Sequence, residues 1–158
     1  MKRVLSIQDI SCIGKCSLTV ALPIISAMGI ETSILPTSIL STHTMFNDFT
    51  FRDLTDDMEP IKKHWQKEGF SFDAIYTGYL GSEKQITLVK DYFKTFGNTC
   101  KYIIVDPAMA DNGKLYSGFD KDFPLKMAKL CKYADVILPN ISEAAFMTGM
   151  PYPGENAS

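Results

Sequence analysis

The sequence predicts an α/β protein built as three layers, with helices on both faces of a mostly parallel β-sheet. Three observations lead to this fold. Short apolar segments alternate with segments whose apolar residues recur at helical spacing. Glycine and proline residues separate these segments. The chain has 158 residues, of which 46% are hydrophobic and 22% charged, as expected for one globular domain.

Five apolar segments are predicted to be strands: Arg3–Ile7, Thr32–Leu35, Asp73–Tyr76, Lys101–Val105 and Asp135–Leu138. Strands that alternate with helices form right-handed βαβ units, and such units make a sheet mostly parallel. Ligands of these sheets bind outside the carboxyl ends of the strands. The candidate site is therefore expected in the segments that follow the strands: Gln8–Gly14, Pro36–Phe46, Thr77–Ser82, Asp106–Gly113 and Pro139–Glu143.

Helices are predicted between the strands. The first, Leu18–Met28, is almost wholly apolar, ends at Gly29, and is expected to hold Pro23 near its first turn. Four more are predicted: one from Thr55–Asp57 to Gly69, one after the capping-box pattern Ser82–Gln85, one at Phe123–Tyr133, and a short one from Asn140 to Gly149. Helical spacing predicts buried faces made of Met58, Ile61 and Trp65 in one helix and of Ile86, Val89, Phe93 and Phe96 in the next. We expect one domain over residues 1–150 and a tail at 151–158.

Composition excludes several classes of protein. The net charge is −2 and no basic run occurs, so a nucleic-acid partner is not expected. The longest apolar stretch, Leu18–Met28, is too short to cross a bilayer, and the first residues lack the apolar core of a signal peptide. We therefore expect a cytoplasmic protein without a membrane partner. Its four cysteines are expected to be reduced, buried or half-buried thiols, because the Cys12/Cys16 spacing is not that of a zinc site.

Three carboxylates follow predicted strands: Asp106, Asp111 and Glu143. If they converge, their mutual repulsion requires a cation, and oxygen ligands suit Mg²⁺, which also binds substrate phosphates. This interpretation predicts phosphoryl transfer. A structural interpretation stays open, because Asp-Pro and Asn-Gly are common turn formers and Asn140 with Glu143 matches a helix cap. The sequence contains no P-loop, dinucleotide-binding or nucleophile-elbow pattern.

A second polar group is Ser41-Thr42-His43-Thr44, where hydroxyls flank a histidine and could orient a small polar ring. A purely structural histidine is the alternative. Tyr79 follows a predicted strand and could stack on a ligand or belong to the core. The phenylalanines at 46, 49 and 51 suit either a lid or the core.

Five segments together resemble a known family. They are VLSIQ at 4–8, STHT at 41–44, TGYLGS at 77–82, DPAMAD at 106–111 and LPNISE at 138–143. Their order and their positions at strand ends resemble the pyridoxal (vitamin B6) kinases of the ribokinase-like superfamily. The resemblance runs from Val4 to about Gly149.

The resemblance implies ATP-dependent phosphorylation of the 5′-hydroxymethyl group of pyridoxal, pyridoxine or pyridoxamine. It implies that Thr44 and Tyr79 contact the vitamer with His43 nearby. It also implies an ATP and phosphate region at Asp106, Asn140 and Glu143, with Mg²⁺ near Asp106, Asp111 and Glu143 and possible use of a monovalent cation. Members of the family are typically homodimers with a lid over ATP.

The sequence departs from the family at several positions. Asp9 stands where the family often has a serine that helps hold the substrate ring, so we expect Asp9 to change ring recognition or to favour an amine-bearing vitamer. Thr42, Ala110 and Leu138 also differ from the family pattern. The family's G-x-G-D segment, which supplies the general base and phosphate-binding amides, has no counterpart in this sequence. We therefore expect the N-terminal part of a truncated kinase, without its catalytic base and with a long exposed apolar sheet edge that promotes aggregation.

Two alternatives remain. One is a hydroxymethylpyrimidine kinase of the same superfamily, against which STHT and TGYLGS argue. The other is a non-catalytic chain that only binds a small molecule, which the missing general base favours.

Overall fold

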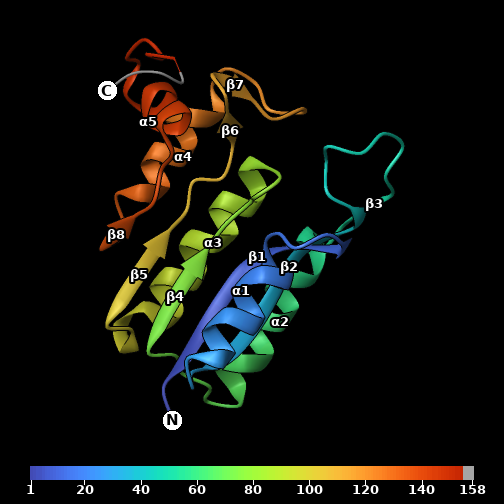
Figure 1. Cartoon of the computed structure of the whole chain (residues 1–158). Helices are drawn as coiled ribbons and strands as arrows, with labels where there is room; N and C mark the ends of the chain where they lie inside the picture. Colours follow the sequence, from blue (N-terminus) through green and yellow to red (C-terminus); the bar gives the residue numbers. More distant parts are fainter. Residues whose placement is uncertain (155–158) are drawn as a thin grey trace.

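The computed structural model describes residues 1–154 and contains a six-stranded sheet in the order β3-β2-β1-β4-β5-β8 (Figure 1). Its strands are β1 (Arg3–Ile13), β2 (Glu31–Thr42), β3 (Phe51–Asp53), β4 (Ala74–Thr77), β5 (Tyr102–Val105) and β8 (Val136–Ile137). All pairings are parallel except that of β3 with β2. The mostly parallel sheet is confirmed. The part of the predicted tail after residue 154 lies outside the described residues.

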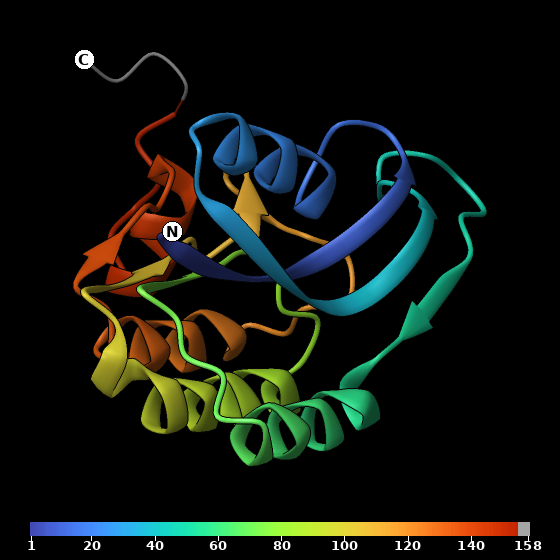
Figure 2. The same ribbon diagram turned by 90° about the horizontal axis from the view of Figure 1, so that it is seen from below.

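The helices form the two outer layers. They are α1 (Leu18–Ala27), α2 (Thr55–Lys67), α3 (Glu83–Phe96), the 3₁₀ turn η1 (Gly97–Thr99), α4 (Phe123–Cys131) and α5 (Ile141–Thr148). Figure 2 shows α2, α3 and α4 side by side on one face of the sheet and α1 alone on the other. The three-layer α/β/α architecture is therefore confirmed. None of the helices in residues 1–154 is long and apolar enough to span a bilayer.

The main core lies between the sheet and helices α2–α4. The predicted face of α3 is confirmed, because Ile86, Val89, Phe93 and Phe96 are all buried. Tyr92 adds to this face, and its hydroxyl donates a 2.6 Å hydrogen bond to the carbonyl of Met58 in α2. The predicted face of α2 is also confirmed, since Met58 is fully buried and Ile61 and Trp65 pack against the same core. Edge-to-face aromatic contacts complete this core: Trp65 with Phe72, Tyr92 and Phe96, and Phe72 with Phe96.

The other face of the sheet is only partly covered. Helix α1 packs on β1 and β2. Within residues 1–154 no helix covers this face of β4, β5 and β8, so Tyr102 is 45% exposed and Val136 is 40% exposed. The expected apolar edge is present at β8, where Val136 and Ile137 are 40% and 45% exposed, but this strand has two residues and is not long. The expected aggregation stays a prediction.

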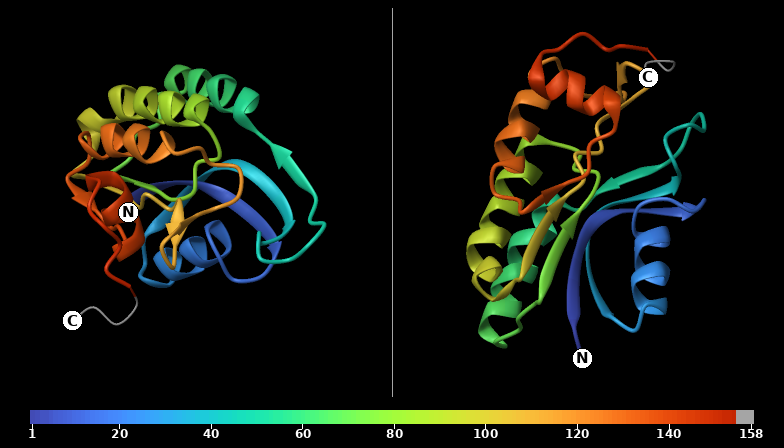
Figure 3. Two further views of the ribbon diagram at one scale, coloured as in Figure 1. Left: turned by 90° about the horizontal axis from the view of Figure 1, so that it is seen from above. Right: turned by 60° about the vertical axis from the view of Figure 1, so that its left-hand side comes forward.

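Two segments predicted as loops are largely strand. β1 continues to Ile13 and β2 to Thr42, so Figure 3 shows two long neighbouring strands. The predictions failed because parallel pairing uses only backbone groups, which polar residues supply as well as apolar ones. The register slips between them, since Gln8 pairs with Pro36 whereas Ile10 pairs with Ile39. Two residues of β2 thus lie opposite one of β1, which is a β-bulge.

Several smaller predictions were wrong. Pro23 lies inside α1, beyond its first turn. The Ser82–Gln85 capping box is half formed, because the Ser82 hydroxyl accepts the Gln85 N–H but the Gln85 side chain accepts the Gly81 N–H instead. The four cysteines are free thiols as expected, but Cys12 is exposed.

A short hairpin was not predicted. It consists of β6 (Ala110–Asp111) and β7 (Lys114–Leu115), which are antiparallel. The connecting residues Asn112 and Gly113 have φ angles of 50° and 71°, as a two-residue hairpin turn requires. The turn-forming interpretation of Asn112-Gly113 is therefore confirmed.

Candidate functional site

Strand β1 carries two buried polar side chains with unpaired oxygens. Leu5 and Ile7 are fully buried on the face of β1 that covers the main core. Asp9 and Ser11 lie on the same face of the strand, beyond the core. Asp9 is 5% exposed and Ser11 is 1% exposed. Asp9 Oδ1 and Ser11 Oγ have no hydrogen-bond partner within residues 1–154. Burial raises the pKa of the Asp9 carboxyl, and the Ser17 hydroxyl offsets this only in part.

The loop between β1 and α1 approaches the end of β2. A Cβ on Gly14 would lie 2.9 Å from the His43 ring, and the φ of Gly14 is +107°, so glycine is required there. Ser17 also has a positive φ, of 50°, which is unusual for a residue with a side chain. Lys15 and Cys16 lie between these two positions. The close packing fixes the place of His43.

The segment after β2 holds His43 and Thr44. The His43 ring lies 4.8 Å from the Phe46 ring, measured between centroids. Met45 and Phe46 are exposed by 89% and 52%. The chain then returns to the sheet as β3, which Figure 1 shows at the far edge. The segment is therefore attached at both ends to the sheet, while Met45 and Phe46 are exposed.

Tyr79 follows β4 and is held by a buried polar cluster. Its carbonyl accepts a 3.4 Å hydrogen bond from the Thr37 hydroxyl in the bulge of β2. Burial raises the pKa of its phenol, and the negative charges of Asp9 and Asp53 add to the effect. Its ring lies 5.6 Å from that of Phe119, between centroids.

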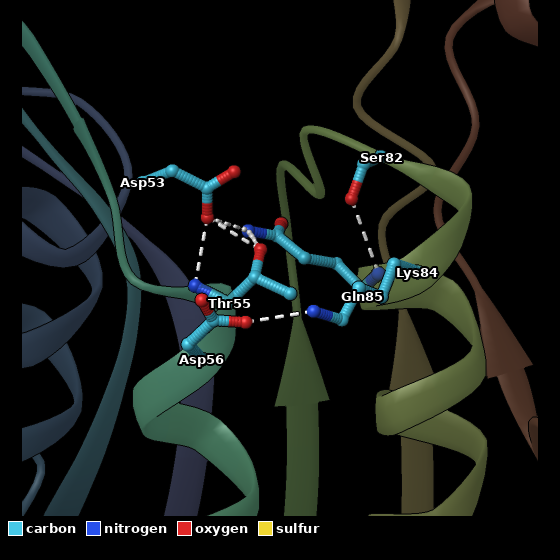
Figure 4. Close-up of polar contacts among 6 residues, drawn as sticks. All are labelled: Asp53, Thr55, Asp56, Ser82, Lys84 and Gln85. Atoms are coloured by element: carbon cyan, nitrogen blue, oxygen red, sulfur yellow. Dashed lines mark hydrogen bonds and ion pairs between the residues drawn. The ribbon is translucent and has the colours of Figure 1, made fainter.

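Gln85 is the centre of this polar cluster (Figure 4). It is 1% exposed. Its Nε2 donates to the Thr55 hydroxyl at 3.0 Å and to the Thr37 carbonyl at 3.0 Å, and its Oε1 accepts from the Gly81 N–H at 2.8 Å. Thr55 donates in turn to Asp53 at the end of β3. The cluster thus joins β2, β3, α2 and the loop that carries Tyr79.

These segments line an open cavity of about 400 Å³, here called the first cavity. Its lining includes Asp9, Ser11, His43, Thr44, Tyr79 and Asp111. The structure thus brings together the four residues that the sequence predicted for substrate binding: Asp9, His43, Thr44 and Tyr79. Their binding roles stay predictions. Sequence reasoning missed Ser11 and Gln85, although the alternation of Ile7, Asp9 and Ser11 was a signal for the first of them.

Asp106 lines a second cavity, of about 430 Å³, on the α1 side of the sheet. Lys15, Cys16, Ser17, Tyr79 and Ala108 border both cavities, so the two adjoin. Burial, together with the nearby charge of Glu143, raises the pKa of Asp106 to about 6. Negative charge is therefore concentrated where the second cavity meets the sheet.

Asn140 and Glu143 cap helix α5. The Asn140 side chain accepts the Glu143 N–H at 2.9 Å, and Glu143 Oε2 accepts the Asn140 N–H at 2.8 Å, which completes a capping box. Glu143 Oε1 also accepts the Met109 N–H at 3.1 Å, and Asn140 Nδ2 donates to the Ala110 carbonyl at 2.8 Å. The structural interpretation of these two residues is therefore confirmed.

The expected group of three metal-binding carboxylates does not form. No group of three or more His, Cys, Asp or Glu side chains within residues 1–154 could hold a metal ion. The reason is local: both Glu143 oxygens accept backbone N–H groups, and Asp111 lines the first cavity while Asp106 lines the second. A metal at this place would have to bind fewer protein groups.

Asp106 should make the stability of the chain depend on pH. The raised pKa keeps a proton on Asp106 in the folded state up to about pH 6, whereas in the unfolded state the carboxyl has its ordinary pKa of 3.8. Folding therefore takes up a proton between these values, and stability falls as the pH rises through this range. Replacing Asp106 by Asn removes this loss, so the variant should gain about 1–2 kcal/mol relative to the parent between pH 4 and 7.

Urea denaturation at several pH values measures this difference. The matched control is Asp57→Asn, since Asp57 is exposed in the first turn of α2. The control should follow the parent at every pH. A difference between Asp106→Asn and the parent that stays constant from pH 4 to 7 would contradict the prediction.

The sequence matches the family model of phosphomethylpyrimidine kinase over residues 31–157. The chain belongs to this family. Its fold is the ribokinase-like fold of the solved pyridoxal kinases, and the prediction of that superfamily is confirmed.

Several proteins of known sequence or structure are similar to this chain. A pyridoxal kinase of Actinobacillus pleuropneumoniae is 28% identical over 159 residues, which are 95% of this chain and 54% of the relative. The crystal structure of the Lactobacillus plantarum pyridoxal kinase has a TM-score of 0.90 and 38% identity, over 96% of this chain and 54% of that one. A Bacteroides thetaiotaomicron protein, provisionally described as a phosphomethylpyrimidine kinase and crystallised with pyridoxal, has a TM-score of 0.94 and 44% identity. That match covers 99% of this chain and 55% of the other. The chain thus spans about half the length of its relatives.

Proposed function

We propose that the chain forms the vitamer-binding part of a vitamin B6 kinase, which transfers phosphate from ATP to the 5′-hydroxymethyl group of pyridoxal, pyridoxine or pyridoxamine. One observation carries this proposal. Asp9, His43, Thr44 and Tyr79 come from three separate segments and line a single cavity. A relative that is 44% identical was crystallised with pyridoxal, which supports the same ligand here.

The first cavity suits a flat polar ring. Tyr79 offers an aromatic face for stacking, and the Thr44 hydroxyl and His43 ring offer hydrogen bonds. Asp9 and Ser11 add oxygens that are unpaired within residues 1–154. Such a mixture of an aromatic wall and a few buried polar groups is typical of small-molecule sites.

The second cavity suits the phosphate side of the reaction. Mg²⁺ usually keeps several waters and binds proteins through one or two carboxylates together with substrate phosphates. Asp106 fits that role, because burial and the Glu143 charge raise its pKa and a cation would relieve both effects. Bound Mg²⁺ would neutralise the charge of the transferring phosphate. In this proposal Asn140 and Glu143 support the phosphate region by holding the segment after β5, and Asp111 lies on the vitamer side.

The remaining elements of the proposal come from the family resemblance. They are a homodimer, a cytoplasmic location, use of ATP and a monovalent cation. The resemblance assigns the general base to a G-x-G-D segment, and no such segment occurs in this sequence. We therefore assign no residue of this chain as the base, and expect turnover to require that segment.

A second candidate is phosphorylation of hydroxymethylpyrimidine. The name of the matching family model favours it. The names of the Lactobacillus and Actinobacillus relatives favour the vitamin B6 substrate. Both substrates are small nitrogen heterocycles with a hydroxymethyl group, so only direct comparison separates them.

Calorimetric titration of the chain with each vitamer and with hydroxymethylpyrimidine tests the binding part of the proposal. We expect vitamer binding, and we expect Tyr79→Ala to weaken it about 5- to 10-fold through loss of the aromatic contact. The matched control is Tyr133→Ala, because Tyr133 is 49% exposed and lies outside both cavities. Tighter binding of the pyrimidine than of every vitamer would favour the second candidate.

A turnover assay tests the catalytic part. The chain is incubated with ATP, Mg²⁺ and pyridoxal, alone and mixed with the part of the Lactobacillus plantarum pyridoxal kinase that it does not match. Mass spectrometry detects pyridoxal phosphate. We expect product only in the mixture. Vitamer binding without product in either sample would support a non-catalytic binding chain instead.

A further inference from the structure

Asp9 is a buried acid whose charge is not balanced. It is 5% exposed, and its Oδ1 has no hydrogen-bond partner within residues 1–154. Burial of a carboxylate without an opposite charge beside it is costly, and proteins rarely keep one unless it has a role. The free-energy cost of burying the Asp9 carboxylate therefore requires an explanation beyond packing.

The position of Asp9 directs its side chain into the first cavity. Ile7, Asp9 and Ser11 alternate along β1 and so lie on one face of the strand. The face turns from core to cavity between Ile7 and Asp9, since Ile7 is part of the hydrophobic core and Asp9 lines the cavity. The bulge of β2 lies directly opposite Asp9.

Ser11 repeats the pattern of Asp9. It is 1% exposed, lines the same cavity, and its hydroxyl is also unpaired within the described chain. Two residues of a strand span about 7 Å, so the carboxylate and hydroxyl are neighbours along one wall. Two unpaired oxygens on one wall form an acceptor site for a donor that comes from outside the described chain.

Within residues 1–154, no cationic side chain balances the charge of this wall. Lys15 lines the same cavity, but within residues 1–154 no cationic side chain contributes to the pKa of Asp9, whose main influences are burial and Ser17. An anionic ligand group such as a phosphate would be repelled here. A positively charged N–H donor would instead satisfy the carboxylate and form a charge-assisted hydrogen bond.

We infer that Asp9, together with Ser11, forms a subsite that binds a positively charged N–H group of the substrate. The inference rests on the proposed function, because that function brings nitrogen heterocycles into the cavity. Two groups of the vitamers have this chemistry: the protonated ring nitrogen, which all of them share, and the aminomethyl group, which only pyridoxamine carries. The charge of Asp9 would make the subsite select protonated ligand groups over neutral ones.

The test compares the parent chain with Asp9→Asn, which keeps the shape of the side chain and removes its charge. Calorimetric titration with pyridoxal, pyridoxamine and hydroxymethylpyrimidine gives the affinities. A fourth ligand, the analogue of pyridoxal in which C–H replaces the ring nitrogen, reports on that nitrogen alone. We expect Asp9→Asn to weaken pyridoxal and pyridoxamine about 10- to 100-fold and to leave the analogue nearly unchanged.

Two further variants support the comparison. Ser11→Ala should weaken the same ligands by a smaller factor, about 3- to 10-fold, and it is available if Asp9→Asn does not fold. Asp57→Asn removes an exposed carboxylate and should change no affinity. Thermal unfolding without ligand gives an independent readout: Asp9→Asn should melt about 2–4 °C higher than the parent, because it removes an unbalanced buried charge.

The outcomes distinguish the ring nitrogen from the aminomethyl group as the bound group. They also distinguish failure of this inference from failure of the proposed function. Weaker binding of both pyridoxal and pyridoxamine, but not of the analogue, identifies the ring nitrogen as the bound group. Weaker binding of pyridoxamine alone identifies the aminomethyl group. Pyridoxal and pyridoxamine that bind Asp9→Asn and Ser11→Ala as tightly as the parent overturn this inference and leave the proposed function intact. A parent chain that binds none of these ligands overturns both.

Discussion

Replacing Glu143 by Ala should lower the free energy of unfolding by about 3 kcal/mol. Glu143 is 2% exposed, and its carboxylate accepts the N–H groups of Met109 and Asn140. These bonds join the segment after β5 to the start of α5. Alanine would leave two N–H groups without an acceptor, and each such loss in a buried place costs about 1–3 kcal/mol.

Urea denaturation of parent and variant measures this loss. Glu83 offers a matched control, because it is also an acid in the first turn of a helix but its side chain is 64% exposed. Glu83→Ala should cost less than about 1 kcal/mol even though it breaks an ion pair with Lys126. Glu143→Gln should lie between the parent and Glu143→Ala, since its amide oxygen still accepts one N–H. A cost for Glu143→Ala as small as that of the control would show that the two hydrogen bonds do not hold α5 in place.

Replacing Gln85 by Leu should destabilise the chain by about 2–4 kcal/mol and weaken vitamer binding as well. The two side chains have similar size, so the change mainly removes hydrogen bonds. It leaves the Gly81 N–H and the Thr37 carbonyl without their side-chain partner, and it removes one partner of the Thr55 hydroxyl. The Gly81 bond holds the loop that begins at Tyr79, so the loss should reach the first cavity.

Two measurements separate the effects on stability and on binding. Urea denaturation gives the first, and titration with pyridoxal at a temperature where the variant is folded gives the second. Gln66→Leu is the control, because Gln66 is exposed on α2 and should change stability by less than about 0.5 kcal/mol. If Gln85→Leu loses stability but binds pyridoxal as tightly as the parent, the cluster supports the fold without positioning Tyr79.

The sequence was sufficient to predict the layers of the fold and four of the residues that line the first cavity. Apolar periodicity predicted the sheet and the buried face of α3, and the rule for parallel sheets predicted that residues after the strands would meet. The gathering of His43 and Tyr79, which are far apart in the chain, follows from that rule alone.

Other features depend on three-dimensional partners that a single sequence does not reveal. Asn140 and Glu143 fit both a helix cap and a ligand site, and only the reciprocal hydrogen bonds in the structure show the cap. The strand β3 has three residues, too few for a periodic pattern. The length of β1 was underestimated because Asp9 and Ser11 resemble loop residues, although in the structure their polarity reflects the cavity that they face.

The bulge in β2 makes the number of residues in that strand matter as much as their identity. Before the bulge, the inward Leu35 has an odd number; after it, the inward Leu40 has an even number. A strand that lost one of the two bulge residues would keep all its other side chains and still turn those of the segment leading to His43 toward the opposite face. When homologues of this chain are aligned, a single-residue gap at Thr37 or Ser38 would therefore be a functional difference rather than an unimportant variation in length.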